Sequence, residues 1–502
     1  MSRVNRLLQF FNISHIFSSL ASSSSFFTRR SLSWLVLGSV GGLYSVSALS
    51  QSLSSSPYSR YGLGDLQPAG MAQNFSLGGS GIAWRADTLT PSYINVLNPA
   101  SYAAFRITAI EMGLMSNTTH FQTNDQAFNL NNTSFSYLAV GVPIKRWWGL
   151  SFGIMPYSTV GYNIHTTQVR DTLGLIDYLY QGTGGINKAY VGNGFRLLKE
   201  KYVQRTGTDL SAGFNANYQF GAINNVRHVF FESPNTYDTR VDQNIRIHDF
   251  AFDFGLQLKF RIDSVKKMRN VSTKVGDSTV VVRKRLKTDI EDITFGVGLT
   301  FAPPMGLSAT QDFLERTYIQ PGSYEIIKDT LINNTNQTTI AKIPAKYGIG
   351  ISINRSYHWN ILADYTYQQW SGYSFAGENG GLANSQLASL GFQFQPALRG
   401  SYFSIVRYRF GLKYNETYVT VADTKLTEMS FTFGAAFPVA ISKVKKHEYD
   451  INLYRNYSMV NLGVELGQRG TTSNGLIKES YGRIVLGFTI NDRWFQRFKY
   501  ND

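Results

Sequence analysis

The basic side chains of one predicted strand are the residues best placed to do chemistry. Arg407, Arg409 and Lys413 stand an even number of positions apart, so an extended chain points all three to one side. Guanidinium and ammonium groups form short, charge-assisted hydrogen bonds with carboxylates. The set could therefore hold a ligand carboxylate, pair with acids on the same side, or anchor the N-terminal segment through Arg85 and Asp87. The acids expected on that side are Asp253, Asp364 and Glu465.

Patterns for catalysis or metal binding are weak. The chain has no cysteine, which excludes disulfides and thiolate metal sites. Its seven histidines are scattered, without a His-Glu-x-x-His pair, and no serine sits in a nucleophile elbow. A barrel-type hydrolase could still use His120, His165 or His248, which leaves an enzyme as a distant alternative. The sequence predicts no catalytic residue, metal or cofactor, and we expect a protein that is not an enzyme.

Long segments of alternating apolar and polar residues position these side chains. Every second residue of Asp249–Phe260 is apolar, and Ile293–Phe301 and Trp359–Tyr367 repeat the pattern. Soluble sandwiches also alternate, but their strands usually run about 5–6 residues, whereas a tilted transmembrane strand needs about 9–11. The opposite faces are rich in Gly, Ser, Thr and Asn, as a wet or plugged lumen requires. The pattern therefore favours a transmembrane barrel over a soluble sandwich.

The number of such segments predicts that the strands close into a barrel. A closed antiparallel barrel with both ends in the periplasm needs an even number of strands, and we count fourteen, of which the fifth is the weakest. The connections 165–207, 303–341 and 370–385 fall on one side, as external loops do, and 172–200 has spacing that suggests two short helices. A Lys- and Arg-rich hairpin, 263–288, falls on the other side. The predicted strands are 105–117, 131–144, 148–164, 208–219, 225–232, 243–262, 289–302, 342–354, 357–369, 386–396, 403–417, 425–439, 457–468 and 477–491.

The first fifty residues predict a Sec export signal. Four arginines precede an apolar run that ends at Ala48-Leu49-Ser50, the order of charged, apolar and small residues that such signals share. The alternative is an N-terminal membrane anchor. The net charge of +15 could suggest nucleic acid, but many of these charges fall in predicted turns, so we expect no nucleic-acid partner. An exported barrel belongs in the bacterial outer membrane.

The segment between the signal and the first strand predicts a plug. Its LGGSGIA stretch, Leu77–Ala83, is not a phosphate-binding loop, because no Gly-Lys-Ser/Thr follows and no βαβ unit surrounds it. A fourteen-stranded barrel is too wide for its own side chains to fill. Asn98 before Pro99 is expected in an extended turn. Segment 51–104 is therefore a candidate plug, and a periplasmic linker is the alternative.

These residues resemble the FadL family of outer-membrane transporters (OMPP1/FadL/TodX). Its members carry a Gly-x-Ala…Asp…Asn-Pro-Ala segment that folds into the barrel as a hatch. The resemblance covers most of the mature chain, although only the hatch motif is specific, and the start Tyr58–Asp65 and the last five residues look like Bacteroidota-type paralogues. It implies a signal at 1–50, a hatch at 51–104 and an all-β, fourteen-stranded antiparallel transmembrane barrel at 105–502. The implied hatch or gating residues are Gly79, Gly81, Arg85, Asp87, Asn98, Pro99 and Ala100.

The resemblance also implies a way out through the wall. Proline cannot donate to a strand ladder, so Pro156 marks either a simple bulge or, as in FadL proteins, a kink that opens a lateral gate bordered by Gly153, Pro156 and Tyr157. The implied function is a channel for hydrophobic or amphipathic small molecules of the long-chain fatty acid type, with outer-membrane lipid and the cargo as partners. Some FadL-like barrels instead serve type IX secretion as docking subunits. The charged lumen and the 263–288 hairpin favour such a scaffold, which would bind other outer-membrane or periplasmic proteins.

Overall fold

The structure is a computed structural model, and it is almost entirely β. No helix among the described residues is long and apolar enough to cross a membrane. The expected signal at 1–50 and Asp87 lie outside the described residues. Those residues are 56–86, 93–124, 126–171, 174–232, 236–266, 269–275, 278–284, 290–322, 324–397, 401–439 and 458–492.

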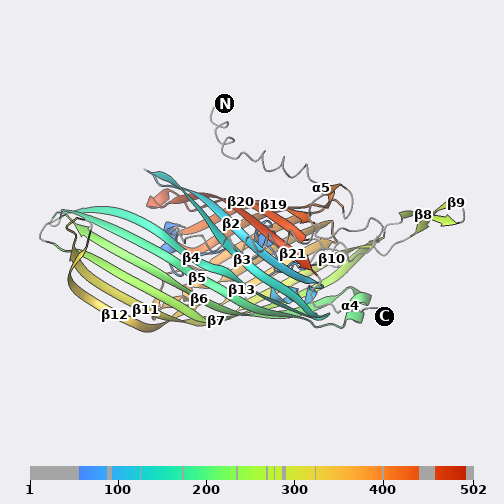
Figure 1. Ribbon diagram of the computed structural model, residues 1–502, viewed down its shortest axis with the longest axis horizontal. Helices are drawn as coiled ribbons and strands as arrows, with labels where there is room; N and C mark the ends of the chain where they lie inside the picture. The colour runs from blue at the N-terminus through green and yellow to red at the C-terminus, as the bar shows by residue number, and fades with distance from the viewer. Residues whose placement is uncertain are drawn as a thin grey trace, which may run out of the picture. The chain divides into compact units, whose positions relative to one another are not determined.

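Within these residues, fourteen antiparallel strands form a closed ring (Figure 1). Each strand pairs with the next, and β2 pairs with β21 from Thr108↔Asp492 to Gln122↔Lys478, which closes the barrel. The predicted fold class is confirmed. The ring consists of β2 (Thr108–Gln122), β3 (Ala127–Lys145), β4 (Trp148–Arg170), β5 (Gly174–Arg196), β6 (Asp209–Phe231), β7 (Asp238–Lys266), β10 (Ile290–Ala302), β13 (Lys346–Arg355), β14 (Trp359–Gln368), β17 (Ser385–Phe394), β18 (Arg407–Val421), β19 (Thr424–Val439), β20 (Ser458–Arg469) and β21 (Lys478–Asp492).

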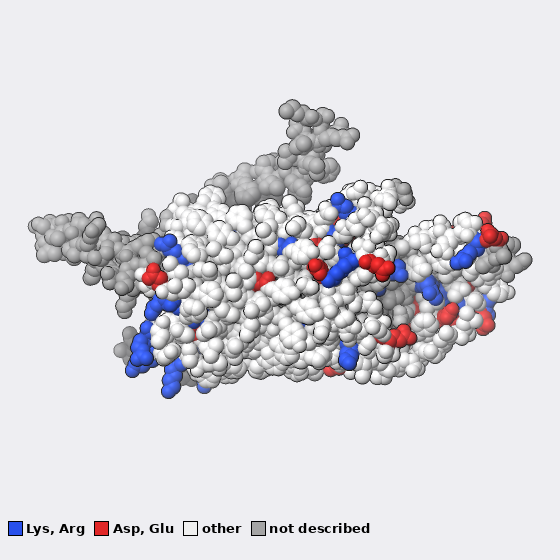
Figure 2. Space-filling model, turned by 180° about the vertical axis from the view of Figure 1, so that it is seen from behind, with Lys and Arg blue, Asp and Glu red and all other residues white. Residues whose placement is uncertain are grey.

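The barrel wall is apolar outside and polar inside. On β7, Ala251 and Gln257 are buried on the lumen face, whereas the apolar side chains between them are exposed. This inversion of a soluble core is expected where lipid is the solvent. Figure 2 shows Lys and Arg gathered near one end of the barrel, beside a broad and nearly uncharged wall. The exposed residues of β7 are Phe250, Phe252, Phe254, Leu256 and Leu258.

One side of the barrel extends well beyond the other. β4, β5 and β6 have 23 residues each and β7 has 29, and they are continued by β11 (Met305–Ile319) and β12 (Ile326–Ile343) (Figure 1). Pro156, Asn187, Phe220 and His248 lie side by side across β4–β7. Beyond this line β7 and its partner β11 carry charged side chains, as in the 2.8 Å pair of Arg246 with Asp312, so the extension lies outside the bilayer.

We name this extension the surface sheet. It comprises the parts of β4–β7 beyond Pro156, Asn187, Phe220 and His248, together with β11 and β12. Outer-membrane barrels direct their longer connections to the outside and keep short turns in the periplasm, so the surface sheet faces the exterior.

The surface sheet corrects three sequence expectations. Segment 165–207 is not a loop with two helices, because β5 occupies Gly174–Arg196, and 303–341 is β11 and β12 rather than a loop. The expected strand 225–232 is the outer end of β6. The missed strand β5 and the extra strand expected at 225–232 offset each other, so the predicted count of fourteen strands was right. Outside the bilayer both faces of a strand meet water or polar groups, and the apolar alternation that marks a transmembrane strand disappears.

The remaining elements are short. Inside the barrel lie four pieces of the N-terminal segment, and the predicted 263–288 hairpin contains a separate two-stranded sheet. The inner pieces are η2 (Pro57–Arg60), β1 (Asp65–Leu66), α3 (Ala72–Phe75) and η3 (Pro99–Ala104); the others are α4 (Glu200–Thr206), β8 (Arg269–Val275), β9 (Ser278–Lys284), η5 (Trp370–Gly372), β15 (Ser374–Phe375), β16 (Glu378–Asn379), α5 (Tyr402–Ile405) and η6 (Ser473–Gly475).

Candidate functional site

The N-terminal segment fills the lumen because wall glycines let its backbone come close. A Cβ on Gly298 of β10 would collide with the Ile82 carbonyl, and one on Gly411 of β18 would collide with the Gly78 amide. Only glycine removes this obstacle. We call residues 56–86 and 93–104 the hatch. Other wall glycines whose Cβ would meet the hatch include Gly149, Gly194, Gly213, Gly255, Gly350, Gly391, Gly434, Gly463 and Gly487.

The Asn-Pro-Ala motif binds the hatch to the wall. Asn98 Nδ2 donates to the Ile82 carbonyl at 2.8 Å and to the wall carbonyls of Leu256 and Leu299 at 3.2 and 3.3 Å. Its Oδ1 accepts from Ala100 N at 3.1 Å and so caps η3. Pro99 takes the first helical position, where a missing N–H costs nothing. Asparagine is needed here because one amide serves both the cap and the wall.

Asp364 of β14 holds the glycine-rich turn. Its Oδ2 accepts hydrogen bonds from Gly81 N at 2.6 Å and Ile82 N at 2.8 Å, and the side chain is buried. Gly79 has a φ of +85° with open space around it, so glycine is required there by conformation rather than by contact. The sequence suggests Asp364 only as a partner for the lumen cations, so its hydrogen bonds to the hatch were not predicted.

Two further acids hold other parts of the hatch. Arg85 pairs with Asp209 of β6 at 2.8 Å and donates to Ser211 Oγ at 3.1 Å. Glu111 of β2 accepts from Ile94 N at 2.7 Å and from Gln73 Nε2 at 2.9 Å. Sequence reasoning missed both acids. Their lumen-facing positions could have indicated them, since an acid on that face needs a partner.

The three predicted lumen cations do not form one site. Arg407 Nε donates to Gln395 Oε1 at 3.0 Å. Arg409 Nε donates to Gln393 Oε1 at 2.9 Å, and its Nη1 donates to Asn461 Oδ1 at 2.8 Å. Both arginines are buried, and neither forms an ion pair with any described residue. Their hydrogen bonds to described residues go to neutral amides, and Arg409 is also attracted by the charge of the Glu111 carboxylate.

Lys413, in contrast, belongs to a charged network that reaches the hatch. It pairs with Glu465 at 2.6 Å and with Glu428 at 3.2 Å, and Arg483 contacts the same two glutamates. A neighbouring pair joins Arg469 to Asp65 of the hatch at 2.6 Å. For Lys413 the structure shows the paired arrangement that the sequence offered as an alternative to ligand binding.

A cavity of about 240 Å³ lies between the hatch and this network. Leu66, Ile82 and Leu387 form apolar parts of its lining, whereas Lys413 and Arg483 are among its charged residues. Typical ligand sites measure about 300–1,000 Å³, so the cavity is small with the hatch in place. Its lining is amphipathic.

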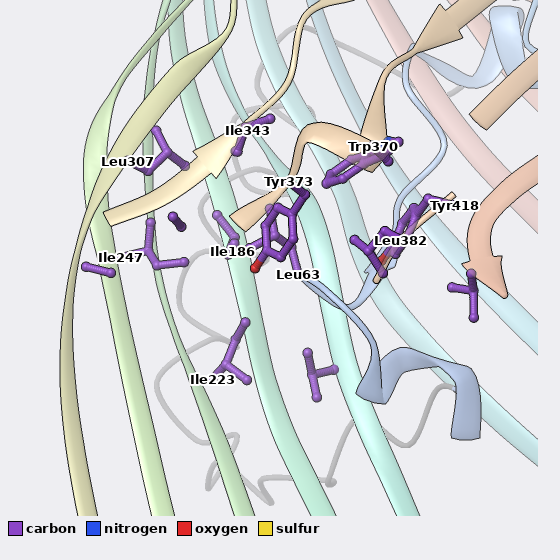
Figure 3. Close-up of a cluster of buried hydrophobic side chains, with 14 of the residues drawn as sticks. Leu63, Ile186, Ile223, Ile247, Leu307, Ile343, Trp370, Tyr373, Leu382 and Tyr418 are labelled. Atoms are coloured by element: carbon purple, nitrogen blue, oxygen red, sulfur yellow. The ribbon is translucent and has the colours of Figure 1, made fainter. Parts of the chain in front are cut away.

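An apolar cluster at the outer mouth adjoins the cavity, because its Tyr418 also lines the cavity. Figure 3 shows the cluster. It joins Leu63 of the hatch to Trp370 and Tyr373 of an external loop and to wall residues of the surface sheet. The Trp370 ring lies against the Tyr418 ring, tilted by 30°, with ring centroids 4.6 Å apart, and burial raises the pKa of Tyr373 to about 12. The cluster therefore packs the hatch against the outer part of the barrel.

The strand ladder between β3 and β4 ends before the two strands do. Their ladder runs from Lys145↔Trp148 to Leu138↔Ile154, and no described residue of β3 pairs with β4 beyond that point. Gly153 lies within the paired part. Pro156 lies just above it, and the β4–β5 register shifts between Pro156 and Ser158. We call this gap between the outer parts of β3 and β4 the wall opening.

The hatch covers the inner side of the wall opening. β1 pairs with β4 through Asp65↔Thr159 and Leu66↔Ser158. Gln67 adds two hydrogen bonds, from its N to the Tyr157 carbonyl at 3.0 Å and from Nε2 to Thr159 Oγ1 at 2.9 Å.

A second, small cavity beside Pro156 shares part of its lining with the lumen cavity. Gln67, Pro68, Ala69 and Phe75 line both. The hatch turn is therefore the partition between lumen and wall opening.

The three histidines considered for catalysis lie on separate strands and are all exposed. His120 Nδ1 is 2.7 Å from Asn129 Oδ1, and His165 Nε2 is 3.9 Å from Asp177. The structure therefore does not bring the three histidines together.

A closed antiparallel ring with an apolar outer wall and a plugged lumen defines a bacterial outer-membrane β-barrel. The chain belongs to the BamG family, whose model matches residues 36–501. No curated protein sequence compared with the chain matches it. Several solved outer-membrane channels are similar to the chain.

Three solved structures illustrate the similarity. The CymD monoaromatic hydrocarbon channel is 11% identical with a TM-score of 0.47, over 87% of this chain and all of that one. A FadL homologue from Pseudomonas aeruginosa is 10% identical with a TM-score of 0.48, over 85% and 99%. The toluene transporter TodX from P. putida is 12% identical with a TM-score of 0.48, over 86% and 100%.

Proposed function

We propose that this protein is an outer-membrane channel for a small hydrophobic or amphipathic molecule of the long-chain fatty acid type, which leaves sideways through the wall opening. The observation that carries the proposal is the partition formed by Gln67, Pro68 and Ala69. These residues line the lumen cavity on one side and the cavity beside Pro156 on the other. A shift of this one turn would connect lumen and wall.

Few bonds hold the partition. Gln67 contributes two hydrogen bonds to β4, and a typical hydrogen bond contributes about 0.5–1.5 kcal/mol net. Gly70 has a φ of +102°, so the backbone can turn sharply there. Releasing the turn therefore costs on the order of 1–3 kcal/mol in hydrogen bonds, a cost that binding of an apolar cargo can offset. In our proposal Pro156 and Tyr157 frame the exit.

The amphipathic cavity suits a cargo with one polar end. A carboxylate beside Lys413 would compete with Glu428 and Glu465, which already occupy that ammonium group. Arg407 and Arg409 carry no described ion pair and face the lumen on the same side of β18 as Gly411, where the wall meets the hatch. We propose that they bind the cargo carboxylate once the hatch has moved.

The absence of cysteine permits a direct test. Leu66→Cys with Ser158→Cys joins β1 to β4 at positions that are partners in the ladder, and such pairs have Cα separations compatible with a disulfide. Transfer of a fluorescent fatty acid by the reconstituted barrel is measured before and after reduction. We expect transfer to stop when the pair is oxidised and to return with reductant.

A matched control pair joins two wall strands. Met459→Cys with Thr489→Cys links partners of β20 and β21 and leaves the hatch free, so oxidation should not change transfer. Equal transfer by the oxidised and reduced forms of the hatch pair would refute lateral passage past β1.

The apolar cluster at the outer mouth favours a second candidate, a scaffold that binds other envelope proteins. It packs at the outer mouth where cargo would arrive, and the surface sheet offers a large area beyond the membrane. Purification from native membranes in mild detergent, with mass spectrometry of co-eluting species, separates the two. A lone barrel carrying stoichiometric lipid supports the channel, whereas a stable protein complex without lipid supports the scaffold.

A further inference from the structure

The surface sheet is open, and its two edges differ. Beyond Pro156, over the described residues, β4 is paired with β5 on one side and only with the two residues of β1 on the other. β12 is paired with β11 on one side and only with the two residues of β15 on the other. Both edges therefore carry unpaired strand backbone outside the bilayer. Exposed edges invite pairing with another chain, and natural proteins usually protect them.

The β12 edge has such protection. Its register with β11 shifts three times, between Gln311 and Phe313, between Glu315 and Arg316, and between Thr317 and Tyr318. Asn336 within it has a φ of +54°. Bulges bend a strand and interrupt the regular spacing of its free N–H and C=O groups, so a second strand cannot follow this edge for long.

The β4 edge has none of these devices. From Ser158↔Ile186 to Arg170↔Gly174 its register with β5 is uninterrupted. Residues 160–169, VGYNIHTTQV, contain no proline and no Lys, Arg, Asp or Glu. An edge that is long, regular and uncharged is the kind that accepts an added strand.

Contacts with the hatch reveal which backbone groups face outward from this edge. The Tyr157 carbonyl accepts from Gln67 N, and Gly161 N donates to Ser59 Oγ at 3.1 Å. Backbone groups of an antiparallel strand alternate between its two sides. The N–H and C=O groups that continue this side therefore belong to Asn163, His165, Thr167 and Val169.

We propose that the β4 edge, residues 162–169, receives an extended strand from a partner protein at the cell surface. The added strand continues the ladder that β1 begins at Ser158 and Thr159. Six residue steps at about 3.3 Å give a paired length of about 20 Å from Asn163 to Val169. The partner's strand is uncharged, and its polar and apolar residues alternate. Its polar residues lie beside Asn163 and Thr167, and its apolar residues lie beside Tyr162 and Ile164. This inference does not rest on the channel function.

Hydrogen exchange resolved to single residues tests the ladder. The assembly purified from native membranes in mild detergent is compared with the same barrel stripped of bound proteins by chaotrope. We expect slower exchange at Asn163, His165, Thr167 and Val169 in the assembly, in an alternating pattern, with no change along β12. Equal exchange in both samples, or protection without alternation, would overturn the proposal. Alternating protection in a pure dimer of this chain would overturn it too, by placing a second copy on the edge.

Proline variants test the same edge by an independent route. Thr167→Pro removes an N–H from the β4 edge. Thr338→Pro is the matched control, because the Ile340 carbonyl accepts from Ala376 N and so places the Thr338 N–H on the free side of β12. We expect Thr167→Pro to lower the amount of partner protein that co-purifies with the barrel at least tenfold. Thr338→Pro and Thr167→Ala should leave this amount unchanged. Heat-modified gel mobility shows whether each barrel is folded. Full retention by a folded Thr167→Pro barrel would refute strand addition, as would equal loss in Thr167→Ala.

Discussion

Replacing Asp364 by alanine should release the hatch without unfolding the barrel. Its carboxylate accepts hydrogen bonds from the amides of Gly81 and Ile82 at 2.6 and 2.8 Å, and it is the buried charge that fixes the glycine-rich turn. The strand ladders on either side of β14 involve only backbone groups. The substitution therefore acts on the hatch and leaves the ring intact.

The magnitude follows from these two bonds. A hydrogen bond to a charged group contributes about 1.5–3 kcal/mol, and two such bonds lose part of that value to the cost of burying the carboxylate. We expect the seated hatch to be destabilised by about 3 kcal/mol, which corresponds to roughly a hundredfold larger released population. Asp364→Asn keeps an oxygen acceptor but loses the charge, so its effect should be about half as large in free energy.

Protease accessibility and single-channel conductance measure the outcome. A released hatch is cleaved within 56–86 at low protease concentration, and the emptied lumen conducts ions. Asp253→Ala is the control, because this lumen acid accepts from Asn217 of the wall at 2.8 Å and no described hatch residue. If Asp364→Ala leaves both cleavage and conductance at the wild-type level while the barrel is folded, then Asp364 does not anchor the hatch and the argument fails.

Three other substitutions test separate parts of the structure. Gly298→Ala places a Cβ against the Ile82 carbonyl, so we expect faster proteolysis of the hatch with an unchanged barrel on heated gels. Trp370→Ala removes a fully buried side chain at a cost of about 3–5 kcal/mol, and uptake of a bulky dye through the outer mouth should rise. Pro156→Ala lets β4 extend its regular ladder, so fatty acid transfer should fall several-fold while thermal stability is kept or increased; unchanged transfer would argue against the wall opening as the exit.

The alternation of apolar and polar residues was enough to predict the transmembrane strands. In Asp249–Phe260 the phenylalanines and leucines share one face, and the structure exposes that face to lipid. The same rule failed at Gly174–Arg196, because β5 leaves the bilayer near Asn187 and lipid no longer imposes an apolar face on it. The structure therefore has a strand where spacing suggested helices.

The hatch motif predicted what fills the lumen but not how it is held. Asn98 and Gly81 were named from the sequence. In the structure Asn98 donates to the Ile82 carbonyl within the hatch, and Gly81 N donates to Asp364 of the wall. Their partners, the Leu256 and Leu299 carbonyls and Asp364, come from strands more than 150 positions away. No local pattern links such positions, because ring closure alone decides which strands face the hatch.

The sequence by itself determined the barrel, its even strand number and the identity of the plug, since bilayer thickness and the period of two act on each strand locally. Only the tertiary structure decided the rest. It separated Lys413 from Arg407 and Arg409 by giving Lys413 acidic neighbours on adjacent strands. It ended the β3–β4 ladder at Ile154 and left one edge of the surface sheet regular and the other bulged. These features depend on register and on contacts between distant segments, which have no signature in the local order of residues.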